Sequence, residues 1–270
     1  MWVLPCLDCT NSSTCHWNKS MWLSTSPQET CLYDVTQEEQ RRQNLSKYLN
    51  DKVLMFVGDS TLRDLMFALV EHLNGSLGYS TQSHDQLNVN YTRSTNIRFA
   101  YFPRFDVEPQ LQPTFMQRVN SLFELSPFME EAILIVGGAQ WLKISMLNEL
   151  ARFLESRKPT SKSFGKVRII VKDHSAGFHS PIPGLPYIPW TKRKHLAHLN
   201  EAVVRRAKYY GWSVLQTHRL TWTRMDHFEA YARCSCHFHQ IQRLSNSIYT
   251  VTGHIMHTIL RIFEQTLLSE

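Results

Sequence analysis

Hydrophobic residues in this chain form short continuous runs that alternate with stretches of helical periodicity. The first run, from Val53 to Val57, is apolar throughout, which is typical of a strand buried on both faces. Behind it, apolar residues recur at helical spacing from Leu62 to Leu73. The pattern therefore predicts a buried strand, a tight turn at Gly58 and a helix that follows directly.

The same alternation continues to the end of the chain. It predicts strands at 97–102, 132–136, 167–171 and 212–215, and helices at 37–49, 113–125, 143–156, 191–210 and 247–268, with a polar loop at 75–93. Apolar strands that alternate with helices indicate a mostly parallel sheet covered on both faces. We therefore expect a three-layer α/β/α sandwich.

The composition changes near residue 50. Residues 1–50 are rich in Cys, Ser, Thr and Trp, whereas residues 51–270 carry the strand and helix pattern. We therefore expect a Cys-rich N-terminal extension (1–50) and one α/β domain (51–270), because a chain of 270 residues with 43% hydrophobic residues can bury one substantial core. The first residues lack the basic region and apolar core of a signal peptide, so we expect the chain to belong to a longer, multidomain protein or to lack its true start.

Cysteines and glycosylation sequons indicate the compartment. The cysteines are Cys6, Cys9, Cys15, Cys31, Cys234 and Cys236, and the sequons lie at Asn11, Asn18, Asn44, Asn74 and Asn90. Cysteines grouped at the two ends of the chain favour disulfides between the extension and the C-terminal part, although the sequence does not choose the pairing. Together the two patterns favour a glycoprotein in the lumen of the secretory pathway or outside the cell.

Charge and hydropathy argue against nucleic-acid binding and against a transmembrane segment. The formal net charge is +6, but Lys and Arg are scattered along the chain rather than gathered in one segment. We therefore expect no nucleic-acid binding. The longest apolar run, 132–136, is the length of a strand, and spanning a bilayer requires about 20 residues, so no transmembrane segment is expected.

The tripeptide Gly58-Asp59-Ser60 places a candidate nucleophile where the first strand meets the first helix of the domain. In open α/β sheets this carboxyl edge is where ligands bind. Free backbone N–H groups and the helix dipole beside Ser60 would stabilise an oxyanion. Asp59 is interpreted as a turn residue. The alternative is that the tripeptide forms a simple turn before a helix N-cap.

Three blocks occur in an order that resembles a known hydrolase group. They are Gly58-Asp59-Ser60, Gly137-Gly138-Ala139-Gln140-Trp141, and Cys234-Ser235-Cys236-His237-Phe238-His239. The order resembles the SGNH/GDSL hydrolases, and more closely their PC-esterase branch, in which Arg commonly follows Gly-Asp-Ser after three residues, here Arg63. The resemblance implies the SGNH fold and the addition or removal of acyl groups, typically acetyl, on glycans or glycoproteins in the endoplasmic reticulum, in the Golgi or outside the cell.

The resemblance also implies roles for individual residues. Ser60 would be the nucleophile and His237 the general base, and the oxyanion donors would be the amides of Ser60 and Gly138 with the side chain of Gln140. No cofactor would be required, and acetyl-CoA or another acyl donor would be needed only by a transferase. Arg63, Trp141 and His179 are candidate substrate contacts, with a local salt bridge, core packing and a solvated loop as their respective alternatives.

The chain departs from the family pattern at the acid of the site and at Gln140, which stands where SGNH enzymes usually have Asn. Three residues before His237, where the family has Asp, stands Cys234, so Cys234 or the more distant Asp226 would have to orient the base. The alternative function is therefore an inactive esterase-like module that binds glycan or protein. A zinc site of Cys and His is a further alternative, but alternation in an extended segment would place both cysteines on one face and both histidines on the other. We predict no metal, and His239 is the alternative base.

Overall fold

The computed structural model describes most of the α/β domain. The described residues are 2–3, 21–22, 38–78, 84, 86–92, 95–104, 107–108, 110–124, 131–156, 165–176, 190–223, 237–245 and 248–269. The cysteines and the residues Asn11, Asn18, His179 and Asp226 lie outside this set, so the expectations that concern them stay predictions. Near the N-terminus, β1 (Trp2–Val3) pairs antiparallel with β2 (Met21–Trp22).

A six-stranded sheet forms the centre of the domain. Its order is β4 (Leu87–Asn90), β5 (Asn96–Tyr101), β3 (Lys52–Gly58), β6 (Glu131–Gly137), β7 (Lys166–Lys172) and β8 (Ser213–Leu215). All neighbouring strands run parallel except β4, which is antiparallel to β5. Because β3 lies between β5 and β6, the residues that follow these three strands meet at one edge of the sheet.

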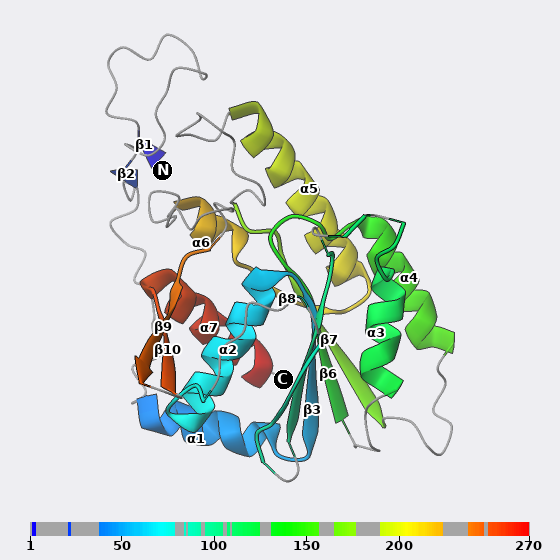
Figure 1. Cartoon of the computed structure of the whole chain (residues 1–270). Coiled ribbons are helices and arrows are strands. Elements are labelled where there is room, and N and C mark those ends of the chain that lie inside the picture. Colours follow the sequence, from blue (N-terminus) through cyan, green and yellow to red (C-terminus); the bar gives the residue numbers. More distant parts are fainter. Residues whose placement is uncertain are drawn as a thin grey trace.

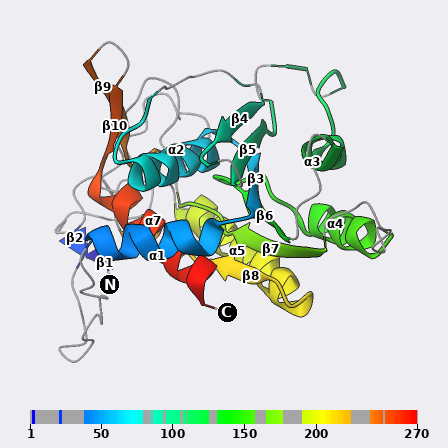
Figure 2. The same ribbon diagram turned by 90° about the horizontal axis from the view of Figure 1, so that it is seen from below.

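Helices cover both faces of the sheet, as Figures 1 and 2 show. One layer contains α1 (Glu38–Leu49), α2 (Ser60–Asn74) and α7 (His254–Leu268), and the other contains α3 (Phe115–Glu124), α4 (Ile144–Ser156) and α5 (Trp190–Tyr209). Along β3, Leu54 and Phe56 face the first layer, while Val53, Met55 and Val57 face the second. The predicted α/β class with a mostly parallel sheet is confirmed.

The predicted helix at 247–268 is wrong in its first part. Residues Ile248–Thr252 form strand β10, which pairs antiparallel with β9 (Gln240–Ser245), and α7 begins only at His254. Gly253 separates the two elements with a φ of 132°, a conformation that favours glycine. The β-branched residues of β10 suit a strand, although their spacing also matched a helical stripe.

Two further elements were missed by the periodicity. Strand β4 lies within the predicted polar loop at 75–93, because its pairing with β5 depends on tertiary contacts rather than on an apolar pattern. The short helix α6 (His218–Thr223) follows β8. Helix α1 was predicted, and its Leu45 and Leu49 are fully buried in the core beside α2 and α7. The domain boundary at residue 51 stays a prediction.

Two further features concern the helices and the sequon residues. Among the described residues, no helix has the length and apolar character needed to cross a bilayer. The sequon residues Asn44 and Asn74 are exposed, on α1 and at the end of α2.

We expect Gly58→Ala to destabilise the protein. A Cβ at this position would overlap the carbonyl oxygen of Gly137 and would lie 2.7 Å from Cδ2 of Leu62, and both neighbours belong to the packed core. Overpacking of this kind costs about 1–3 kcal/mol in the free energy of unfolding, which urea denaturation measures. The matched control is Gly78→Ala, whose Cβ would meet nothing within 4 Å. Equal losses in the two variants would contradict the expectation.

Candidate active site

Ser60 is the first residue of α2 and directly follows the turn at the end of β3. The side chain of Asp59 caps the helix by accepting hydrogen bonds from the backbone N–H of Thr61 at 2.9 Å and from its hydroxyl at 2.7 Å. The serine therefore lies at the carboxyl edge of the sheet, at the positive end of a helix, as the sequence predicted.

His237 approaches this serine from the other end of the chain. The Oγ atom of Ser60 lies 3.2 Å from Nε2 of His237, which stands in the segment that leads into β9. The side chain of His237 is 18% exposed. The structure therefore brings the predicted nucleophile and the predicted base within hydrogen-bonding distance, although 177 residues separate them in sequence.

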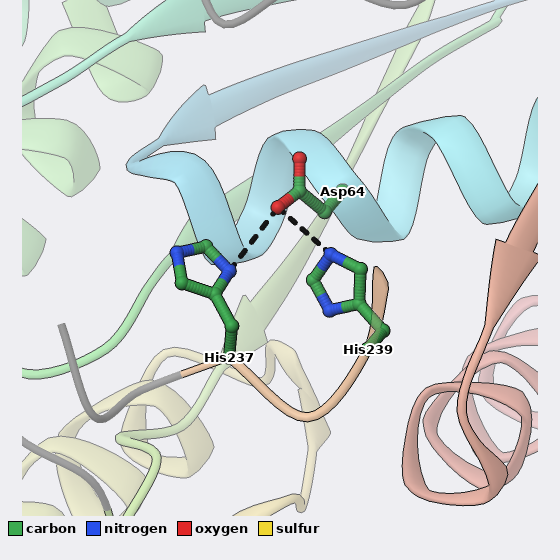
Figure 3. Close-up of side chains that lie close together, drawn as sticks. All are labelled: Asp64, His237 and His239. Atoms are coloured by element: carbon green, nitrogen blue, oxygen red, sulfur yellow. Dashed lines mark hydrogen bonds and ion pairs between the residues drawn. The ribbon is translucent and has the colours of Figure 1, made fainter. Parts of the chain in front are cut away.

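The carboxylate that faces the base is Asp64, which the sequence reasoning missed. Its Oδ2 lies 3.2 Å from Nδ1 of His237 and 2.9 Å from Nε2 of His239 (Figure 3). Asp64 lies one turn after Ser60 on α2, so an i, i+4 spacing places both side chains on the same side of the helix. This spacing is visible in the sequence, but the Asp-X-X-His pattern of SGNH hydrolases points instead to residues before the histidine, such as Cys234 and Asp226.

Arg63 neutralises the charge of this carboxylate. The side chain of Asp64 is only 4% exposed, and its Oδ1 accepts a hydrogen bond from Nε of Arg63 at 3.0 Å. Arg63, a candidate substrate contact, is itself buried and makes the local salt bridge that was its alternative. Its guanidinium thus influences the site indirectly, by pairing with the carboxylate of Asp64.

The environment moves the pKa values of Asp64 and His237 in opposite directions. Burial would raise the pKa of Asp64, but the charges of His239 and Arg63 and hydrogen bonds from both histidines hold it well below 3.8. Burial would lower the pKa of His237, but the hydrogen bond and charge of Asp64, together with the charge of Asp59, raise it above 6.5. Asp64 therefore stays ionised while His237 can accept a proton near neutral pH.

The loop after β6 lies beside the serine and is fixed at one peptide group. The carbonyl oxygen of Gly138 accepts a hydrogen bond from Nζ of the buried Lys172 at 2.9 Å, and the N–H of Ala139 donates to Oδ2 of Asp59 at 2.7 Å. A Cβ on Gly138 would lie 2.5 Å from that same Oδ2, so only glycine fits there. Asp59 thus connects the turn before Ser60 to the predicted oxyanion loop.

Gln140 supplies a side-chain donor on this loop. Its Nε2 is buried and has no hydrogen-bond partner among the described residues. A buried donor without an acceptor is costly, so this amide has an unmet requirement for an acceptor. Trp141, in contrast, is buried and packs against the rings of Phe102 and Phe115, with centroids 5.0 Å and 6.0 Å away, which was the packing alternative for this residue.

Tyr101 lies on the other side of Ser60, at the end of β5, and the sequence reasoning missed it. It pairs in register with Gly58, and its buried ring lies against that of His84, with centroids 4.3 Å apart. Burial and the charge of Asp59 raise its pKa to about 12, and hydrogen bonds with Ser60 only partly offset them. The phenol therefore stays protonated beside the serine, at a position that the predicted strand end would have indicated.

Asp64, His237 and His239 are also the set of side chains in the described part of the chain that could hold a metal ion, since their ligand atoms lie within 4.8 Å of one another. Arg63 already neutralises the single carboxylate of this set. A divalent ion would therefore add two positive charges beside a buried guanidinium, which is unfavourable. Hydrogen bonds explain these contacts without that cost.

Comparison with known proteins adds little to this geometry. No family model matches the chain. Among solved structures, the chain is similar to a "putative acylhydrolase" from Bacteroides fragilis, with 10% sequence identity and a TM-score of 0.40 over 88% of this chain and 98% of the other. A likeness this weak carries no functional argument.

Replacing Asp64 by Asn should destabilise the protein by about 3–5 kcal/mol at neutral pH, because it removes the carboxylate that Arg63 and both histidines contact. The pKa of Asp64 is lower in the folded state than its ordinary value of 3.8, so its contribution is present above that pH and is lost as the pH falls through the folded-state value. The stability difference between wild type and Asp64→Asn should therefore shrink in acid.

Urea denaturation at a series of pH values measures this difference. Asp51→Asn is the matched control, because Asp51 is exposed and its φ of 59° is one that Asn adopts readily. A stability difference that stays constant from neutral pH to about pH 3 would show that folding does not lower the pKa of Asp64.

Proposed function

We propose that this chain is a serine hydrolase or acyltransferase that acts on acyl esters. The observation that carries the proposal is the continuous contact from Ser60 Oγ to His237 Nε2 at 3.2 Å and from His237 Nδ1 to Asp64 Oδ2 at 3.2 Å. A nucleophile, a base and an orienting carboxylate within hydrogen-bonding reach are the requirements of a catalytic triad.

In this proposal the carboxylate fixes the tautomer of the base. Asp64 accepts the hydrogen on Nδ1 of His237, so the lone pair of Nε2 faces Ser60. His237 takes the proton of the hydroxyl as Oγ bonds to the acyl carbon, and Asp64 stabilises the resulting imidazolium. His237 then returns the proton to the leaving oxygen as its bond to the acyl carbon breaks. The acyl group on Ser60 passes to water or to a sugar hydroxyl by the reverse sequence of proton transfers.

The negative charge of the tetrahedral intermediate would be stabilised by donors on two elements. The Ser60 amide lies at the N-terminus of α2, where backbone N–H groups and the helix dipole favour an anion. The Gly138 amide and Nε2 of Gln140, which has no partner in the described part of the chain, come from the loop after β6. Lys172 supports this loop by holding the Gly138 carbonyl, so the donors are fixed before the charge develops.

For the substrate we propose O-acylated glycans or glycoproteins. This part of the proposal rests on the resemblance of the three sequence blocks to PC-esterases, and on sequons and cysteines that favour the secretory pathway or the cell exterior. The proposed chemistry needs no metal or nucleotide cofactor. Acetyl-CoA or another acyl donor would enter only if the acyl group is transferred rather than hydrolysed.

The alternative, an inactive esterase-like module that binds glycan or protein, loses its main support. It rested on the missing acid before His237 and on Gln140 in place of the Asn that is usual in SGNH enzymes. Asp64 supplies a carboxylate at the base from the helix of the nucleophile itself. The change from Asn to Gln is then the remaining argument for this alternative, and Gln retains the amide donor.

A fluorophosphonate probe should label wild-type protein at Ser60. Ser60→Ala should abolish labelling because the nucleophile is removed, and His237→Ala should slow it by roughly 10²- to 10⁴-fold because the general base is lost. Gel fluorescence measures the rate, and peptide mass spectrometry identifies the labelled residue. His195→Ala, at an exposed position of α5, is the control and should label like wild type. A folded wild-type protein that stays unlabelled would support the binding module instead.

The labelling rate should rise with pH, because only neutral His237 can accept the serine proton. The pKa of His237 is raised, so half-maximal labelling is expected at a pH above 6.5. Asp64→Asn removes the main cause of this shift, and its midpoint should move to lower pH while the maximum rate falls. Rates measured from about pH 5 to 9 test both statements, and a wild-type midpoint at or below 6.5 would contradict the raised pKa of His237.

A further inference from the structure

Asp64 accepts one more hydrogen bond than its salt bridge with Arg63 and its contact with His237 account for. The additional donor is His239. The same oxygen, Oδ2, lies 2.9 Å from Nε2 of His239 and 3.2 Å from Nδ1 of His237. The contact with His239 is the shorter of the two. Figure 3 shows both rings directed at this oxygen from one short segment. The alternative base of the sequence analysis therefore points at the carboxylate, and His237 is the ring that reaches Ser60.

The surroundings of His239 define its hydrogen-bonding state. Its side chain is 3% exposed, and its Nδ1 is buried without a hydrogen-bond partner among the residues that the structure describes. A hydrogen on Nε2 satisfies Asp64, so the ring presents one donor to this carboxylate. His239 is thus built to donate one hydrogen bond to Asp64.

The backbone holds His239 in this place. Gly253, between β10 and α7, approaches it so closely that a Cβ on this glycine would lie 2.9 Å from Cα of His239. The same histidine directly precedes β9, which pairs with β10 along its length. The His239 ring is therefore fixed to the hairpin, and Asp64 is fixed to α2, so their contact joins two rigid elements.

We propose that His239 is a positioning residue: by sharing Oδ2 of Asp64 with His237, it sets how strongly this carboxylate holds the catalytic base. The inference rests on the proposed function of Ser60 and His237. The negative charge of one oxygen is divided between two N–H donors, so each donor is held less strongly than it would be alone. His239 thereby keeps His237 basic enough to take the serine proton and acidic enough to return it.

The other groups that act on His237 remain in place when residue 239 is changed. They are Asp64 and Arg63 on α2 and Asp59 in the turn before it. Removing the donor at 239 leaves the full charge of Oδ2 to His237. The pKa of His237 should then rise further, and it should return towards the wild-type value when another donor of similar reach replaces the imidazole.

The experiment is an NMR titration of the His237 ring in wild type, His239→Leu and His239→Gln. Leu has a similar volume but no donor, whereas Gln places an amide N–H at a similar distance along the side chain. We expect the midpoint of His237 to rise by about half a unit to one unit in His239→Leu and to stay near wild type in His239→Gln. The acid limb of the fluorophosphonate labelling profile should move in the same direction.

Each outcome of the titration bears on the proposal. An unchanged midpoint in folded His239→Leu, or an equal rise in His239→Leu and His239→Gln, would overturn it. If His239→Leu does not fold, His239→Asn replaces it, because its shorter amide cannot reach Asp64. The NMR midpoint does not depend on labelling. A shifted midpoint in a protein that never labels would therefore support the link between His239 and His237 and reject the proposed enzymatic function.

Discussion

The buried carboxylate of Asp64 is the interaction on which the geometry of the site depends. An ionised carboxylate inside a protein is costly unless charges and hydrogen-bond donors surround it. Arg63 supplies the charge from the same helix, and His237 and His239 supply donors from a segment more than 170 residues away. Satisfying this charge therefore draws the hairpin of β9 and β10 onto α2. The same contact places His237 beside Ser60.

A second buried carboxylate, Asp59, organises the opposite side of Ser60. One of its oxygens caps α2 and the other accepts the N–H of Ala139, so the turn after β3 and the loop after β6 share one anion. Nζ of Lys172 donates a hydrogen bond to the neighbouring carbonyl oxygen of Gly138. The serine is thus set between two carboxylates with different tasks. Asp59 fixes the backbone around it, while Asp64 holds the histidine that lies against its hydroxyl.

The sequence predicted what local periodicity encodes. The strands before Ser60 and Gly138 are continuous apolar runs, and the parallel sheet follows from their alternation with helices. Two kinds of feature were not predicted from the sequence. Strand β10 has a spacing that also fits a helical stripe, and the periodicity does not encode its pairing with β9. The role of Asp64 was missed because a carboxylate among apolar helix positions acquires its partners only when the chain folds.

The position of Asp64 on α2 determines which side chains the tertiary fold has to bring together at the site. In the SGNH/GDSL pattern that the three sequence blocks resemble, the acid and the base lie on one segment, Asp-X-X-His. Local structure there relates the acid to the base, and the fold relates both to the serine. In this chain the serine and the acid share α2, and their relation is set by one helical turn. The histidine alone has to be brought in by tertiary packing. A second histidine on the same carboxylate doubles the contact that achieves this, so the arrangement replaces a local constraint on the base with a tertiary one.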